Sequence, residues 1–307
     1  MSNYFDNKQL FNMPETTQYG SHMIMTNIKK ESKFKYINID TRFSDNYNYL
    51  DNTANYNITL PDKLNNVKSM SVTNVELPVS YYNISSAIGN NIFYVTNTST
   101  NVTTKIILPD SQYTTSSLIT AINTLLPANL TFNINASGYS TFTTTTIPYT
   151  INFNVDDTGD IKIAPGNNKL TPKFKLGWVL GFRSLTYAMS TSKTITSEYT
   201  ANIVGPKYVY LVIDEYQNGN QNSFISLLSS SLIKKNIIAR VTTPYNIYPY
   251  GTVIPANLSN GLLTTDTRSY TGKIDIQRLN IQIIDENGHI MNLNGEDVSF
   301  CLVLEYE

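Results

Sequence analysis

Apolar and polar residues alternate along short stretches in most of the chain from Phe34 onward, and proline, glycine or asparagine separates one stretch from the next. The pattern is present in "FKYINI" (34–39), "YNITL" (56–60), "VKSMSVTNVEL" (67–77) and "NIFYVTN" (91–97). Alternation with a period of two places apolar side chains on one face of a β-strand. Many short strands separated by turn residues indicate an all-β fold.

One stretch, "LPDSQYTTSSLITAINTLLP" (108–127), departs from this alternation. Its apolar residues follow helical spacing, and they are Leu118, Ile119, Ile122, Leu125 and Leu126. We predict a helix that is capped at Thr115 or Ser116 and ends at Pro127. Further on, "FKLGWVLGFR" (174–183) predicts one helical turn or a tightly packed corner. Together with the strand patterns around them, these stretches predict a small α+β module over residues 101–199.

Longer strand patterns return after residue 200, in "KYVYLVID" (207–214), "NIIARV" (236–241), "GKIDIQRLNIQIID" (272–285) and "VSFCLVLEY" (298–306). In the third of these, the alternation changes phase near Gln277 and Arg278, which predicts a β-bulge. No internal repeat of fixed period is evident. One β-domain with an inserted module explains this order better than two independent domains.

Composition narrows the classes of function. Only 15% of the residues are charged and the formal net charge is −1, so the chain has no general electrostatic attraction for nucleic acid or membranes. No apolar run approaches the roughly 18 residues of a membrane span, and no leader pattern opens the sequence. The one cysteine, Cys301, excludes an internal disulfide. We expect synthesis in a reducing cytoplasm. Residues 1–32 show no period and predict an N-terminal arm without a core of its own.

Candidate chemistry is sparse. The stretch "VYLVIDEY" (209–216) resembles the acidic strand of an NTPase, with Asp214 and Glu215 in the metal-holding positions, but the chain lacks the glycine-rich phosphate loop. His22, His289 and Cys301 are the only soft metal ligands, and no two of them have the spacing of a metal site. We therefore predict no cofactor and no metal.

Acidic pairs could in principle serve a carboxylate-based hydrolase. Each pair lies next to a glycine or asparagine, which favours a solvated turn, and the candidates are Asp156, Asp157, Asp285, Glu286, Glu296 and Asp297. Asp40, Arg42 and Asp45 in "NIDTRFSDN" (38–46) could likewise be an acid and its clamp. The end of a strand, with Asp40 and Arg42 bonded to each other or to the local backbone, is the better interpretation. We predict no catalytic residue.

Tyrosine is abundant, with 22 residues, and occurs in loops without neighbouring lysine or arginine. Tyrosine-rich loops suit protein interfaces. We consider five residues as candidates for an interface: Tyr245, Tyr248, Tyr250, Tyr81 and Tyr82. For "YNIYPYG" (245–251), a proline-braced loop that packs on its own sheet is an equally good interpretation.

Several stretches, taken in order, resemble a virion structural protein of the nucleocytoplasmic large DNA viruses. They are "YINIDTRFSDNYN", "ITLPDKLNNVKSMSVTNVELPVSYYNIS", "LPDSQYTTSSLITAIN", "LGWVLGFR", "GPKYVYLVIDEY" and "DIQRLNIQIIDENGHIMNLNGEDVSFCLVLEYE". The resemblance covers most of residues 34–307 and leaves out the arm.

This resemblance implies an all-β jelly-roll β-sandwich formed by residues 33–100 and 200–307, a small inserted α+β module at 101–199, and an extended N-terminal arm at 1–32. It implies a capsid protein of the virion, either the penton protein of pentameric vertices or a minor capsid protein beneath the major shell. The implied partners are further copies of the chain, the major capsid protein and other minor capsid proteins, with the module facing a fibre or host receptor. A carbohydrate- or receptor-binding jelly roll and a carboxylate hydrolase are the competing hypotheses.

Overall fold

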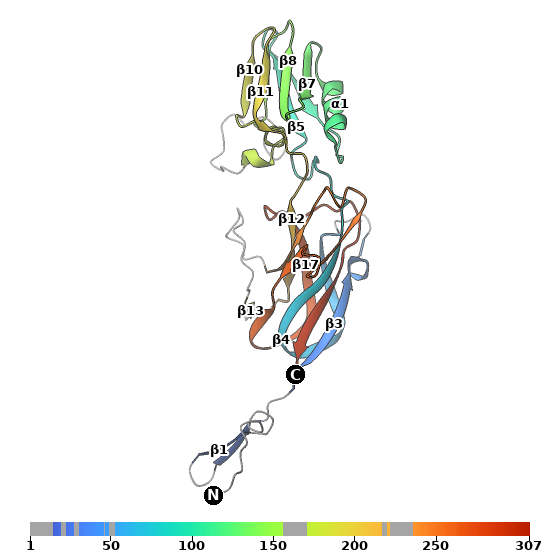
Figure 1. The fold of residues 1–307 in the computed structure, drawn as a ribbon, viewed down its shortest axis with the longest axis vertical. Coiled ribbons are helices and arrows are strands. Elements are labelled where there is room, and N and C mark those ends of the chain that lie inside the picture. The colour runs from blue at the N-terminus through green and yellow to red at the C-terminus, as the bar shows by residue number, and fades with distance from the viewer. Residues whose placement is uncertain are drawn as a thin grey trace.

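The computed structural model describes residues 15–19, 23–27, 31–45, 47–48, 53–155, 171–216, 220–221 and 236–307, with the backbone alone at 15–19, 23–27, 171–172 and 220–221. Within these ranges the chain is mostly antiparallel β-structure, which confirms the predicted all-β class. Figure 1 shows a β-sandwich in the middle of the molecule, a second lobe at one end and a small hairpin beyond the other end.

The sandwich contains a nine-stranded antiparallel sheet that curls around one core. Its strands come from both ends of the chain, and the order β16-β14-β12-β17-β4-β18-β3 is extended by β13 on β17 and β15 on β4. The strands are β3 (Lys33–Asp40), β4 (Asn55–Pro78), β12 (Tyr208–Asp214), β13 (Asn220–Gln221), β14 (Ile237–Thr242), β15 (Val253–Asn257), β16 (Leu263–Thr265), β17 (Arg268–Asp285) and β18 (Ser299–Tyr306).

Strand β4 belongs to both layers of the sandwich. Its residues 55–70 pair with β17, its residues 67–76 pair with β18, and its residues 74–78 pair with β15. A strand that passes from one layer to the other lets a continuous sheet enclose a core. The alternation of β18 illustrates the packing, because Phe300, Leu302 and Leu304 are fully buried while Cys301 and Val303 are half-buried.

The predicted bulge in β17 is confirmed. The register between β17 and β4 shifts between Ile276 and Arg278, next to the change of phase in the sequence. Because of this shift, Ile276 and Leu279 both point into the core although three positions separate them.

The second lobe is the chain between β4 and β12, and it has its own apolar cluster. One four-stranded sheet has the order β10-β9-β5-β6 and one three-stranded sheet has the order β11-β8-β7. The elements are β5 (Ile92–Asn97), β6 (Val102–Ile107), α1 (Thr115–Leu125), β7 (Leu130–Ile134), β8 (Tyr139–Thr144), β9 (Tyr149–Asn152), a 3-10 turn (Thr171–Phe174), α2 (Leu176–Val179), β10 (Thr186–Met189) and β11 (Thr194–Thr200). We call this lobe the module.

The structure of the module extends the sequence-based expectation in one respect and corrects it in another. Its strands form two separate sheets, which the predicted α+β pattern did not specify. Strand Ile92–Asn97, which the range 33–100 had assigned to the sandwich, pairs with β6 and β9 of the module. That assignment is wrong because alternation alone gives no information about which strand is the partner. The division into a sandwich and an inserted module as domains stays a prediction.

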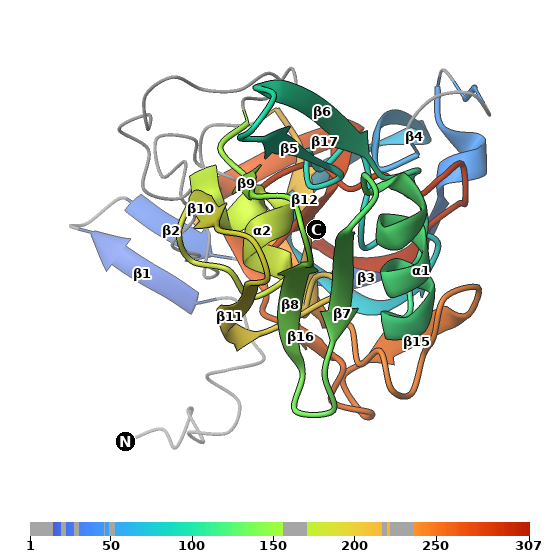
Figure 2. The same cartoon turned by 90° about the horizontal axis from the view of Figure 1, so that it is seen from above.

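The two predicted helical stretches are confirmed, with a correction to the cap. Helix α1 begins one residue earlier than predicted, because Thr114 is the cap and forms a reciprocal capping box with Ser117. Asn123 then joins α1 to β7, since its side chain bonds both to the N–H and to the carbonyl of Phe132. Figure 2 shows α1 beside β7. The "LGWV" segment is the single helical turn α2, and no helix in the described ranges is long and apolar enough to cross a membrane.

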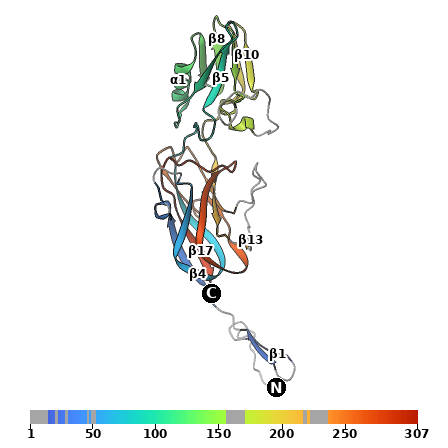
Figure 3. The ribbon, with the colours of Figure 1, turned by 180° about the vertical axis from the view of Figure 1, so that it is seen from behind.

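Part of the predicted arm is a hairpin. Strands β1 (Glu15–Tyr19) and β2 (Met23–Asn27) pair antiparallel and form a two-stranded sheet of their own. Figures 1 and 3 show this hairpin beyond the end of the sandwich where the C-terminus lies, opposite the module.

A buried ion pair joins β17 to the end of β12. Nη1 of Arg268 donates to Glu215 at 2.7 Å and to the carbonyl of Ile213 at 2.8 Å, and Nη2 donates to the carbonyl of Asn236 at 2.8 Å. Both side chains are almost inaccessible, at 2% and 0% exposure. The guanidinium therefore donates hydrogen bonds to one buried carboxylate and to two backbone carbonyls at the same corner of the sandwich.

We predict that Arg268→Ala lowers the free energy of unfolding by about 3–5 kcal/mol, because the buried carboxylate of Glu215 loses the guanidinium that pairs with it. Urea denaturation followed by far-UV circular dichroism measures this loss. Arg278→Ala on the same strand is the matched control, since Arg278 is exposed and lies 4.0 Å from Asp45. Its expected loss is below about 1 kcal/mol. Equal losses in the two variants would contradict the assigned role of Arg268.

Candidate assembly surface

The five candidate tyrosines come from two segments that the fold brings together. Tyr81 and Tyr82 follow the end of β4, and Tyr245, Tyr248 and Tyr250 lie in the loop between β14 and β15. The pairing of Val253 with Pro78 holds this loop against the end of β4. Two backbone hydrogen bonds strengthen the junction, from Gly251 N–H to the Val79 carbonyl at 2.9 Å and from Val79 N–H to the Thr252 carbonyl at 2.8 Å.

The clearest contact between the two segments is the stacking of Tyr82 on Tyr250. Their ring centroids are 5.9 Å apart and the planes differ by 20°. Tyr250 keeps 42% of its surface exposed, and Tyr82 and Tyr245 are half-buried. Stacked rings are rigid and expose both apolar faces and hydroxyl groups, which suits them for contact with another protein.

Two of the five tyrosines have a different role. Tyr81 is buried in the sandwich core, and its hydroxyl bonds to the side chain of Thr243. Burial raises the pKa of Tyr81 to about 12. Tyr248 packs partly against the same core. Tyr81 is therefore inaccessible to a partner, and Tyr248 presents only part of its ring.

Apolar residues that sequence analysis did not select complete this surface. Ile247 is 68% exposed and Val253 is 52% exposed, on the same loop and on the start of β15. We call Tyr82, Ile247, Tyr250 and Val253 the loop patch. Ile247 and Val253 could have been found from the sequence, because they are isolated aliphatic residues in a tyrosine- and proline-rich segment, where polar residues are the rule.

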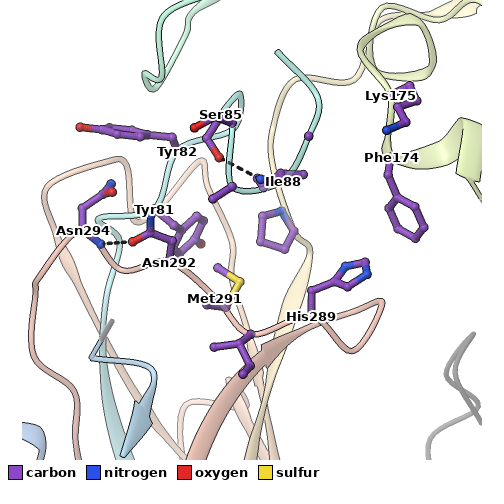
Figure 4. A pocket seen from close by; sticks show the side chains of 15 residues that line it. Tyr81, Tyr82, Ser85, Ile88, Phe174, Lys175, His289, Met291, Asn292 and Asn294 are labelled. Atoms are coloured by element: carbon purple, nitrogen blue, oxygen red, sulfur yellow. Dashed lines mark hydrogen bonds between the residues drawn. The ribbon is translucent and has the colours of Figure 1, made fainter. Parts of the chain in front are cut away.

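A cavity of about 370 Å³ lies next to the loop patch, between the sandwich and the module. Figure 4 shows the segment from His289 to Asn294 on one side, Phe174 and Lys175 on another, and Tyr81 and Tyr82 on a third. His289 meets Phe174 edge-on, with centroids 4.9 Å apart. Asn294 donates to the Ser80 carbonyl at 2.5 Å, which fixes that wall.

The turn that carries His289 is organised by Asp285. Its carboxylate accepts hydrogen bonds from the N–H groups of Asn287 and His289 and lies 3.4 Å from Nδ1 of His289. Burial alone would raise the pKa of Asp285, but these bonds and the imidazole outweigh burial and hold the pKa below its ordinary value. This acid from the hydrolase candidates is thus an element of a turn, as predicted.

The other acidic candidates have similar local partners where the structure describes them. Glu286 accepts a long bond of 3.4 Å from the Lys207 N–H. Asp297 accepts from the Tyr47 hydroxyl at 3.4 Å, and burial together with the charge of Asp40 raises its pKa. Glu296 contributes its backbone carbonyl to Thr53. Asp156 and Asp157 lie outside the described residues.

The acid–arginine stretch near residue 40 ends a strand, as predicted. Asp40 caps a 3-10 turn (Thr41–Phe43), accepting from the Arg42 N–H at 2.9 Å and from its guanidinium at 2.6 Å. The hydrogen bond from the Arg42 side chain is the main reason that the pKa of Asp40 is lowered. Asp45 instead accepts from the N–H and the hydroxyl of Thr59, so the three residues do not converge on one site.

The NTPase-like pair is also separated. Asp214 accepts from the Tyr216 N–H within a turn, whereas Glu215 turns inward to Arg268. The sequence does not predict the buried position of Arg268, because this residue follows a polar turn and no local pattern marks it as buried. Among the described residues, no three histidine, cysteine or acidic side chains are grouped so as to hold a metal ion. His22 lies outside the described residues.

Comparisons with known proteins found similarity among solved structures. No family model and no curated protein matches the chain. Among solved structures, the selenomethionine-labelled mavirus penton protein aligns with 91% of this chain and 100% of its own, at 13% sequence identity and a TM-score of 0.43.

We predict that Asp285→Asn destabilises the protein at pH 7 by about 1–2 kcal/mol, because charge-assisted bonds to the His289 turn become neutral. The lowered pKa means that the ionised form stabilises the fold above the unfolded value of about 3.9, and that this contribution disappears as the pH falls below it. Thermal unfolding at several pH values tests this. The gap between the wild type and the variant should close towards pH 3, whereas Asp62→Asn, at an exposed position of β4, should show almost no gap at any pH.

Proposed function

We propose that this chain is a structural protein of a virion, and specifically the penton protein that forms pentameric vertices in the capsid of an icosahedral large DNA virus. The observation that carries the proposal is the linear arrangement of a β-sandwich between a module at one end and a hairpin at the other (Figure 1). An elongated subunit of this kind has separate ends for the outer and the inner side of a shell. The ordered sequence resemblance over residues 34–307 supports the same assignment.

The mechanism under this proposal is assembly. A closed ring of identical subunits uses a heterologous interface, in which one face of a subunit meets a different face of its neighbour. One layer of the sandwich has two such faces, because β15 and β3 flank β18 and the last part of β4 on opposite sides. The loop patch lies at the β15 side, and exposed Phe34 and Tyr36 lie on β3. The two sides are different surfaces, as ring closure requires.

Under this proposal the chain is not an enzyme. Three of the acids considered for catalysis, Asp40, Glu215 and Asp285, are engaged in turns and ion pairs. The module would face outward and could contact a fibre or a host receptor. The alternative position, that of a minor capsid protein beneath the major shell, uses the same sandwich with a different neighbour.

A carbohydrate-binding role would need open aromatic faces. In the module, the rings of Trp178 and Tyr199 are not open for such contact. The Arg183 guanidinium lies over both of them, 3.9 Å from the ring centroid of Trp178 and 4.7 Å from that of Tyr199. A glycan array tests this competing function directly. Binding that Trp178→Ala abolishes would favour it.

We predict that the purified protein self-associates to five times its 34.5 kDa subunit mass, as measured by light scattering after size exclusion. The double variant Ile247→Asp/Tyr250→Asp should weaken self-association by at least roughly tenfold, since it places charges in the loop patch.

Val102→Asp is the matched control, because Val102 is similarly exposed, at 59%, but lies on β6 of the module. It should assemble like the wild type. A protein that stays monomeric at high concentration would contradict the penton assignment. A monomer that binds the inner face of a preformed major shell would instead support the minor capsid alternative.

A further inference from the structure

Strand β3 forms an edge of the sandwich sheet. It pairs with β18 along all eight of its residues without a register shift, and in the described ranges no strand lies on its other side. An edge strand presents a row of unpaired backbone N–H and C=O groups that can accept another strand. The length of β3 therefore provides room for a complete added strand.

The edge has little of the usual protection against strand addition. Natural edges are shortened, bulged, interrupted by proline or lined with charge. Strand β3 is regular, and its charged residues are Lys33 and Lys35 at its first end and Asp40 at its last position, where Asp40 pairs with Arg42. Its outward face is apolar instead, with Phe34 62% exposed and Tyr36 70% exposed. Half-buried Val303 of β18 pairs with Tyr36, so the apolar surface continues onto the next strand at that position, while Glu305 pairs with Phe34.

The β1–β2 hairpin needs a third strand or a packing surface, which the free edge of β3 can provide. An isolated two-stranded hairpin is at best marginally stable in water, and three strands or a packing surface are needed to hold it. In the described ranges β1 and β2 pair only with each other. Neither strand contains proline, glycine or lysine, and Glu15 at the start of β1 is their one charged residue.

We propose that the β1–β2 hairpin of one copy adds to the free edge of β3 in a neighbouring copy and covers Phe34 and Tyr36. A neighbour's edge is favoured over the hairpin's own edge because Figures 1 and 3 show the hairpin beyond the end of its own sandwich, away from its own β3. The edge strands β6 and β11 belong to the module, which lies at the opposite end of the molecule from the hairpin (Figure 1). This inference rests on the proposed function, because it requires that copies associate.

Single-cysteine variants in a Cys301→Ser background test the contact. One variant carries Thr26→Cys on β2, the other carries Asn38→Cys on β3, and the two are mixed and treated with a short bis-maleimide linker. We expect a product of twice the subunit mass that contains one chain of each variant. Thr264→Cys on β16, at the other edge of the sheet, replaces Asn38→Cys in the control mixture and should give at most a tenth of that product.

A second pair of variants tests the surface itself. Phe34→Ser/Tyr36→Ser in the Asn38→Cys chain should reduce the cross-linked product at least fivefold, while Val102→Ser should leave it unchanged. A chain with both Thr26→Cys and Asn38→Cys that cross-links only within itself would overturn the inference, because the hairpin would then cover its own edge. Absence of any product from protein that light scattering shows to be pentameric would overturn the inference and leave the proposed function intact. Absence of product from a monomeric protein would count against both.

Discussion

The passage of β4 from one layer of the sandwich to the other is the constraint on which the rest of the structure depends. This strand has 24 residues, and its two parts pair with different neighbours. Its buried residues must therefore face a core that lies on the same side of both layers, and Leu60, Val67 and Leu77 do so. The end of β4 then sets the position of Tyr81 and Tyr82 and the start of the module. Any shift of β4 would move the cavity, the loop patch and the module together.

Sequence patterns predicted the strands well and their partners poorly. The alternation in Phe300, Leu302 and Leu304 identifies a strand with one buried face, and the phase change near Gln277 identifies a bulge, because both are local properties. The assignment of Ile92–Asn97 to the sandwich was wrong because pairing is not local. The same limit applies to Arg268, whose burial arises from a carboxylate 53 residues away in the sequence.

In the candidate surface, too, the local pattern was predictable from the sequence and the contacts between segments were not. The tyrosine-rich segments predicted Tyr82 and Tyr250 as interface candidates. Their stacking follows from the register of β15 on β4, which no pattern within either segment contains. Tyr81 looked equivalent to Tyr82 in the sequence. The two differ because Tyr81 enters the core whereas Tyr82 stacks on Tyr250 of the loop. Such a choice requires the position of the core, which only the assembled sheet supplies.

The two exposed surfaces of the sandwich have different physical consequences. The loop patch is formed by side chains on a turn, so its contacts depend on shape and are specific to one partner. The free edge of β3 is formed by backbone groups, which pair with almost any extended chain, including another β3. Edge-to-edge pairing of that kind is isologous and would compete with a ring, which needs a heterologous contact. A hairpin seated on β3 removes this competition, because the edge is already paired when the loop patch meets its neighbour. The N-terminal segment would then act on assembly by excluding the wrong contact as well as by adding a new one.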